Sequence, residues 1–306
     1  MGTIVTIEVV THDRDRSAPA IVDDAIGRAF EWFREIERVF NRFDATSELR
    51  RLCDRPSEAM PASDMLYTAV EFALAVADET AGAFDPTVGA AMERRGFNRD
   101  YRDGRVVSSG VMPNAGEPAS YRDVALDPAA RTILLRRPLV LDLGAVVKGL
   151  AIDMAARELA VCEHYAIDAG GDLYVAGRNA REEPWSVGIR HPRRDREVIE
   201  LLRVSNIAVC TSGDYERQGS GNQDPGQLAH HIIDPRDGQT AARIASATVL
   251  APTAMLADAL ATAAFVLGPA DGISLLERHG VDGLLLTPTL ERFMTRGMPS
   301  AILSHA

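Results

Sequence analysis

One helical segment carries an isolated acid that could bind a cation. Residues 251–268, APTAMLADALATAAFVLG, are mostly apolar, and Asp258 is their single charged residue. A carboxylate desolvated there would need a cationic partner. Thr262 follows four residues later, so both side chains share one helix face and place carboxylate and hydroxyl oxygens side by side. Oxygen ligands favour Mg²⁺ or Ca²⁺ over zinc. The alternative is that Asp258 faces solvent and Thr262 bonds back to the helix backbone.

Two polar turns could bring backbone groups close to a ligand. In LDLGAVVKGLAID, residues 141–153, a strand-like run ends at Asp142 and turns through Gly144 into a helix that carries Lys148. A helix N-terminus attracts anions, although a plain strand-to-helix connection would look the same. In DAGGDLYVAG, residues 168–177, the paired glycines predict a sharp turn or a close approach of the backbone to a ligand.

Two further segments carry groups suited to phosphate or proton chemistry. The polar turn Thr211-Ser212-Gly213-Asp214 follows a strand-like run, and His230 and His231 precede the turn DPRDG at 234–238. A histidine titrates near neutral pH and could serve as a general base or a donor to phosphate. It could equally be a hydrogen-bonded structural group. The turn Phe84-Asp85-Pro86-Thr87 by itself indicates only the end of a helix.

Apolar periodicity predicts the elements that must position these residues. A strand is expected over 3–10, and helices over 19–40 and 63–80, the second with Ser63 as its N-cap and Gly82 near its end. Residues 98–123 are polar and irregular, a possible boundary between lobes. Further strands are expected at 132–135, 138–143, 165–168, 173–177, 185–189, 207–212, 247–250, 283–286 and 292–295. Helices are expected through Leu159, from Thr253, and over 270–279. The fold class is therefore mixed α and β.

Composition limits the possible functions. The 306 residues include 33 Lys and Arg against 44 Asp and Glu, a formal net charge of −11, so general binding to nucleic acid or anionic membranes is not expected. The three cysteines, Cys53, Cys162 and Cys210, are far apart and indicate neither a zinc site nor a disulfide framework. No segment has the length and hydropathy of a membrane span, and no secretion signal or lipobox cysteine is seen. A cytoplasmic location is expected, with a trimmed exported protein as the alternative.

Taken together, these segments resemble a known family. MGT at the start, FNRFDATSELRRL, AGAFDPTVGA, LDLGAVVKGLAID, DAGGDLYVAG, PWSVGIRHP, AVCTSGDYER, HHIIDPRDG and TVLAPTAMLADALATAAFVLG occur in the order found in the ApbE family of FAD:protein FMN transferases. They span nearly the whole chain. The resemblance implies one ApbE-like unit over 1–306, with two interleaved lobes around an FAD cleft.

The resemblance also implies a magnesium site. Its ligands would be Asp258, Thr262 and the main-chain carbonyl of Ala145, which stands where the family usually has the second glycine of D-L-G-G. Alanine in place of this glycine need not prevent metal binding, because the ligand is a main-chain carbonyl. A metal-bound carboxylate is a poor base, so Asp258 is assigned to the metal and the base that deprotonates the acceptor stays open.

The family pattern places a further set of residues at the FAD. Phe43 replaces the aromatic residue of an S-R-Y-like stretch, so it offers a ring face but no hydroxyl. His231 is expected near the pyrophosphate as a phosphate donor or proton carrier. The implied FAD-binding set is Met1, Phe43, Phe84, Asp85, Pro86, Asp142, Lys148, Thr211, Ser212, Gly213 and His231.

The implied activity is protein flavinylation. FMN would pass from FAD to a Thr or Ser hydroxyl of a target flavoprotein with Mg²⁺, releasing AMP, and His231 and Asp258 would be the catalytic residues. One alternative is an Mg²⁺-dependent FAD pyrophosphatase that gives free FMN and AMP. The other is a non-catalytic FAD-binding protein, against which the presence of Asp258, Thr262, Lys148 and His231 argues.

Overall fold

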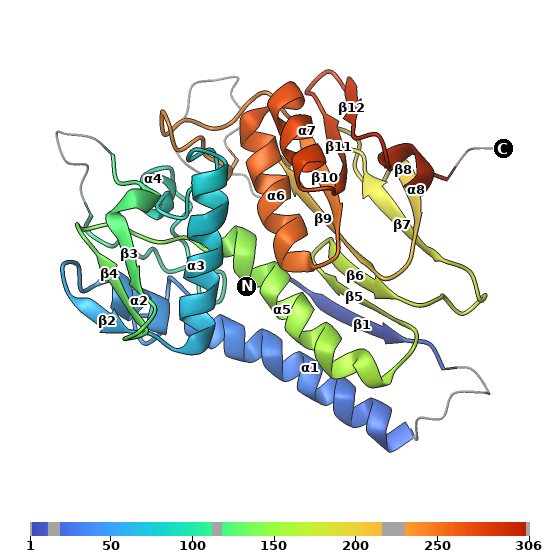
Figure 1. The fold of residues 1–306 in the computed structure, drawn as a ribbon, viewed down its shortest axis with the longest axis horizontal. Helices are drawn as coiled ribbons and strands as arrows, with labels where there is room; N and C mark the ends of the chain where they lie inside the picture. The colour runs from blue at the N-terminus through green and yellow to red at the C-terminus, as the bar shows by residue number, and fades with distance from the viewer. Residues whose placement is uncertain (1, 12–18, 112–117, 216–229, 304–306) are drawn as a thin grey trace. The chain divides into compact units, whose positions relative to one another are not determined.

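The chain folds into two compact units, each assembled from separate segments. The computed structural model describes residues 2–11, 19–111, 118–215 and 230–303 (Figure 1). Among these, the first unit contains Gly2, residues 36–147 and residues 230–241. The second contains residues 3–35, 148–215 and 242–303. The mixed α and β class is confirmed, and the two units interleave along the chain. Residues 98–123 lie inside the first unit, so the division is not there.

The second unit is built on an antiparallel sheet in the order β1-β5-β6-β9-β10-β11-β12. Its strands are β1 (Val5–Val9), β5 (Tyr165–Ala169), β6 (Asp172–Ala176), β9 (Ile207–Gly213), β10 (Ser246–Ala251), β11 (Asp282–Leu286) and β12 (Arg292–Met294). Every residue of β10 is buried, because both faces of this strand are covered.

Different elements cover the two faces of that sheet. Helix α6 (Ala254–Leu267) packs on β9 and β10, and α7 (Pro269–Arg278) packs on β11 (Figure 1). On the opposite face, Val209 and Leu250 share a core cluster with Trp185 of β7 (Trp185–Arg190) and Leu202 of β8 (Val198–Val204). Helix α8 (Met298–Ala301) adds Met298 to the same cluster. The sequence did not predict β8.

The residues of two long helices are divided between the two units. Helix α1 (Pro19–Phe40) contributes its residues up to Glu35 to the second unit, and α5 (Gly144–Glu158) contributes those from Lys148 onward. Glu158 accepts hydrogen bonds from Arg28 Nε at 2.7 Å and Trp32 Nε1 at 3.0 Å, so the two helices are joined within that unit.

The first unit contains a small sheet in the order β2-β4-β3 and several helices. Its other elements are α2 (Glu48–Cys53), β2 (Ala59–Pro61), α3 (Asp64–Glu79), α4 (Gly89–Arg94), the 3₁₀ turn η1 (Tyr121–Asp123), β3 (Val124–Asp127) and β4 (Thr132–Leu135). The predicted cap of α3 is confirmed, since Ser63 Oγ accepts a hydrogen bond from Leu66 N at 3.2 Å.

One predicted strand is wrong. Residues 138–143 make a single bridge, from Val140 to Val88, and no ladder. Leu139, Val140, Leu141 and Leu143 are buried because this part of the segment runs through the core. Instead, Leu141 N donates a hydrogen bond to Cys53 Sγ, and Asp142 N donates one to the Pro86 carbonyl at 2.7 Å. Burial on all sides gives an apolar run that a strand would also give.

The three cysteines lie in the interior of the protein. Cys53, Cys162 and Cys210 form no disulfide and are buried, and burial raises the pKa of the Cys53 thiol to about 11. No helix among the described residues is both long and apolar enough to cross a membrane.

Candidate active site

The start of α6 is fixed by side chains from two elements. Thr253, the N-cap, accepts a hydrogen bond from Leu256 N at 3.4 Å. Asp153 of α5 accepts from Ala254 N at 2.7 Å and from Met255 N at 3.0 Å. Three amides of the first turn therefore have acceptors that the helix itself cannot supply. Burial raises the pKa of the Asp153 carboxyl, and these hydrogen bonds act against that shift.

Asp258 lies on the buried part of α6. The residue is 4% exposed, so the alternative that it faces solvent is wrong. Its Oδ2 lies 3.9 Å from Lys148 Nζ, the cationic neighbour that a desolvated carboxylate requires. Thr262, one turn further, shares a hydrogen bond of 3.1 Å with Ser212 of β9. Asp258, Thr262, Lys148 and Ser212 are thus brought together within the second unit.

Asp172 belongs to the same cluster, and the sequence treated it only as part of a turn. It is 1% exposed and forms an ion pair with Lys148. Its Oδ1 accepts a hydrogen bond from Thr211 N at 3.0 Å, and the Thr211 hydroxyl pairs with Thr248 at 2.9 Å. The paired acids around one lysine could be found only once β6 and α5 were placed in space.

The donor types on α6 suit a hard cation. Asp258 offers a carboxylate and Thr262 a hydroxyl, which are ligands for Mg²⁺ rather than for zinc. Within the described residues, no group of three or more His, Cys, Asp or Glu side chains is arranged to hold a metal. Ala145 belongs to the first unit, and its role stays a prediction.

The Phe84–Thr87 turn in the first unit is held by its own acid. Asp85 accepts hydrogen bonds from Thr87 N at 2.8 Å, from the Thr87 hydroxyl at 2.7 Å and from Tyr121 N at 3.0 Å. Burial raises the pKa of the Asp85 carboxyl, while these bonds lower it. Phe84 and Pro86 are also buried. Contacts of this turn with FAD would therefore come from its backbone.

Arg42 joins two predicted FAD-binding residues, and the sequence did not single it out. Its Nε lies 3.0 Å from Asp142 Oδ2, and its guanidinium covers one face of the Phe43 ring at 4.5 Å from the centroid. Asp142 also accepts from Gly144 N at 2.9 Å. Arg42 Nη1 is buried and has no hydrogen-bond partner among the described residues, so one donor remains for a ligand.

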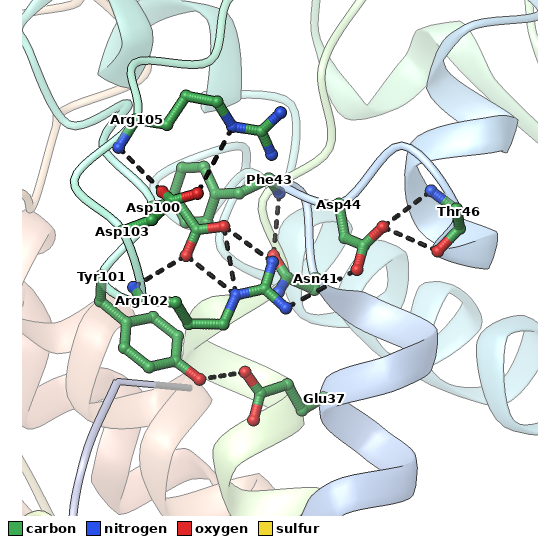
Figure 2. Close-up of polar contacts among 10 residues, drawn as sticks. All are labelled: Glu37, Asn41, Phe43, Asp44, Thr46, Asp100, Tyr101, Arg102, Asp103 and Arg105. Atoms are coloured by element: carbon green, nitrogen blue, oxygen red, sulfur yellow. Dashed lines mark hydrogen bonds and ion pairs between the residues drawn. The ribbon is translucent and has the colours of Figure 1, made fainter.

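A polar loop at residues 100–105 lies beside Phe43 and Asp44 (Figure 2). Asp100 Oδ2 accepts a hydrogen bond from Arg102 Nη2 at 2.7 Å, and Arg102 Nη1 lies 3.7 Å from Asp44 Oδ2. Tyr101 donates its hydroxyl to Glu37, and desolvation together with that bond raises its pKa to about 12. Gly2 sits on the Tyr101 ring, since an added Cβ would lie 3.1 Å from Cγ. Met1 lies outside the described residues.

The two histidines have different surroundings. His230 is buried, and its Nε2 lies 2.8 Å from the Ala241 carbonyl, so that nitrogen must carry the proton. Its Nδ1 then accepts from Ile232 N, which makes His230 a structural group. His231 is half-buried, and its ring meets the Phe97 ring edge to face, with 6.4 Å between the two ring centroids. Arg95 anchors the following turn through Gly238 and Gln239 at 2.9 and 2.7 Å.

Comparison with known proteins identifies the family. A sequence model of the ApbE family matches residues 1–285. A Vibrio cholerae protein named FAD:protein FMN transferase is 30% identical over 308 residues, covering 96% of this chain and 87% of that protein. A Haemophilus influenzae protein of the same name is 29% identical, and the match covers 71% of this chain and 64% of that protein's length. The crystal structure of the ApbE protein from Thermotoga maritima has a TM-score of 0.83 at 29% identity and covers 99% of both chains. This chain belongs to the ApbE family.

Proposed function

We propose that this chain is an FAD:protein FMN transferase that uses Mg²⁺ and releases AMP. The observation that supports this best is the buried cluster on α6, where Asp258 and Thr262 lie beside Lys148 and Ser212. A buried carboxylate next to a hydroxyl on an apolar helix is costly unless it binds something. Relatives that match most of this chain carry the same activity in their names.

The reaction is a phosphoryl transfer from FAD to an acceptor hydroxyl. The Thr or Ser oxygen of the acceptor protein forms a bond to the phosphorus of the FMN half, the pyrophosphate bond to AMP breaks, and the hydroxyl proton passes to a base. Mg²⁺, held by Asp258 and Thr262 with the Ala145 carbonyl, would neutralise phosphate oxygens and keep attacking and leaving groups in line.

The chain's own residues would bind and orient the substrate. Lys148 supplies a positive charge beside Asp258. His231 donates to the pyrophosphate or carries a proton, while Phe43 packs on the flavin and Arg42 Nη1 donates a hydrogen bond to it. Asp142 and the Phe84–Pro86 turn complete the FAD-binding set, together with Met1 and Thr211–Gly213.

A single incubation tests the proposal. The protein is mixed with FAD, Mg²⁺ and an acceptor protein that carries a Thr or Ser flavinylation segment, and AMP and gel-stable flavin fluorescence are measured. Fluorescence on the acceptor with an equal amount of AMP supports transfer. AMP with free FMN would instead identify a pyrophosphatase, and FAD binding without either product a binding protein.

Variants of one acid test the metal assignment. Asp258→Asn should abolish the Mg²⁺-dependent reaction while the protein keeps its circular dichroism spectrum, because the change removes a ligand charge and little volume. Asp23→Asn, an exposed acid on α1, is the matched control and should remain fully active. Undiminished turnover of Asp258→Asn would refute Asp258 as a metal ligand.

A further inference from the structure

One ammonium group lies between two buried carboxylates in the second unit. Lys148 Nζ is paired with Asp172 and lies 3.9 Å from Asp258 Oδ2. The Asp172 side chain is 1% exposed and that of Asp258 6% exposed, so both acids are removed from water. In such surroundings the position of a single positive charge determines how strongly each carboxylate attracts another cation.

Asp172 is held in place from two sides. The hairpin between β5 and β6 turns at Gly170 and Gly171, both with positive φ, so that Asp172 pairs with Ala169 immediately after the turn. A side chain at Gly170 would collide with Thr3, since an added Cβ would lie 2.0 Å from the Thr3 hydroxyl oxygen. The hydrogen bond from Thr211 N fixes Oδ1, which leaves Oδ2 directed at Lys148.

We propose that Asp172 is a positioning residue that holds Lys148 back from Asp258, so that Asp258 can bind a divalent cation. The inference rests on the metal site of the proposed function. An ammonium in direct contact with Asp258 competes with the metal for the same carboxylate. With Asp172 present, Lys148 has a nearer partner and stays beyond hydrogen-bond distance of Asp258 Oδ2. Without that partner, Lys148 moves onto Asp258.

The test compares cation affinity across two single variants and their combination. Mn²⁺ serves as the probe, with free Mn²⁺ measured by electron paramagnetic resonance and Mg²⁺ as competitor. Asp172→Asn keeps an oxygen for Thr211 N but loses the charge, and should weaken Mn²⁺ binding about tenfold, as for other groups behind a metal ligand. Lys148→Met should bind Mn²⁺ at least as tightly as the wild type, because the competing ammonium is gone.

The double variant decides between positioning and simple structural damage. Asp172→Asn with Lys148→Met should recover affinity to within about threefold of the wild type, well inside the tenfold loss of the single change. Lys148→Gln replaces Lys148→Met if the latter does not fold. Asp168→Asn, the acid on the other side of the same turn, is the matched control and should bind Mn²⁺ normally.

The outcomes separate this inference from the function on which it rests. A double variant that binds Mn²⁺ as weakly as Asp172→Asn alone would overturn the positioning role while the metal site stands. Unchanged affinity in Asp172→Asn would do the same. A wild type that binds no Mn²⁺ would overturn the metal assignment itself, whatever the variants show.

Discussion

Removal of the Asp153 carboxylate should destabilise the protein through the first turn of α6. Asp153 accepts hydrogen bonds from Ala254 N and Met255 N at 2.7 and 3.0 Å, and no intrahelical acceptor can replace it at these positions. In Asp153→Ala both amides lose an anionic acceptor. Helices α5 and α6 pack so closely here that no other group can take the place of the carboxylate. An added Cβ at Gly149 of α5 would lie only 2.4 Å from the Ala254 carbonyl oxygen.

The expected loss is about 2–3 kcal/mol of the free energy of unfolding. Each buried donor left without a partner costs about 1–3 kcal/mol, and removal of a desolvated carboxylate returns part of that total. At about 2–4 °C per kcal/mol for large domains, the melting temperature should fall by about 4–12 °C. The matched control is Thr253→Ala, which loses only the longer bond to Leu256 N at 3.4 Å and should cost less than about 1 kcal/mol.

Urea unfolding followed by circular dichroism, with calorimetric melting beside it, measures both variants against the wild type. If Asp153→Ala lowers the free energy of unfolding by less than about 0.5 kcal/mol, the reasoning is refuted, since two unpaired amides at a helix start cannot cost so little. An equal loss in Thr253→Ala would also refute it, because the effect would then belong to the cap and not to the carboxylate of α5.

Two further predictions concern glycine packing and pH. Gly149→Ala should destabilise the protein by about 1–3 kcal/mol, because its Cβ would collide with the backbone of α6. Gly27→Ala in α1, where an added Cβ has no atom within 4 Å, should stabilise it by about 0.5–1 kcal/mol. Equal effects of the two changes on urea unfolding would contradict this packing. Burial raises the pKa of Asp85 above 3.8, so its stabilising contribution is complete below that value and is lost as pH rises through the folded-state pKa. The hydrogen bond from Arg102 lowers the pKa of Asp100 to about 2, so its contribution is complete above 3.8 and is lost as pH falls toward 2. As pH rises, the free energy of unfolding of the wild type should therefore fall relative to that of Asp85→Asn and rise relative to that of Asp100→Asn. Trends of the same sign in the two comparisons would refute these pKa directions.

Local sequence determined much of the secondary structure and the chemistry on single elements. The caps Ser63 and Thr253 fix the starts of α3 and α6 because their side chains reach amides three residues ahead. Asp258 and Thr262 share a face of α6 because they are four residues apart. These relations depend only on the geometry of one helix.

Pairings between distant segments were decided by tertiary structure alone. Asp172 meets Lys148 because β6 and α5 are folded side by side, and Arg42 meets Asp142 because the turn after α1 lies beside the segment before α5. No local pattern marks either contact. The same holds for 138–143, where burial on all sides imitates a strand. Periodicity records which side chains are buried, whereas the charge that a buried acid faces depends on which segment packs against it.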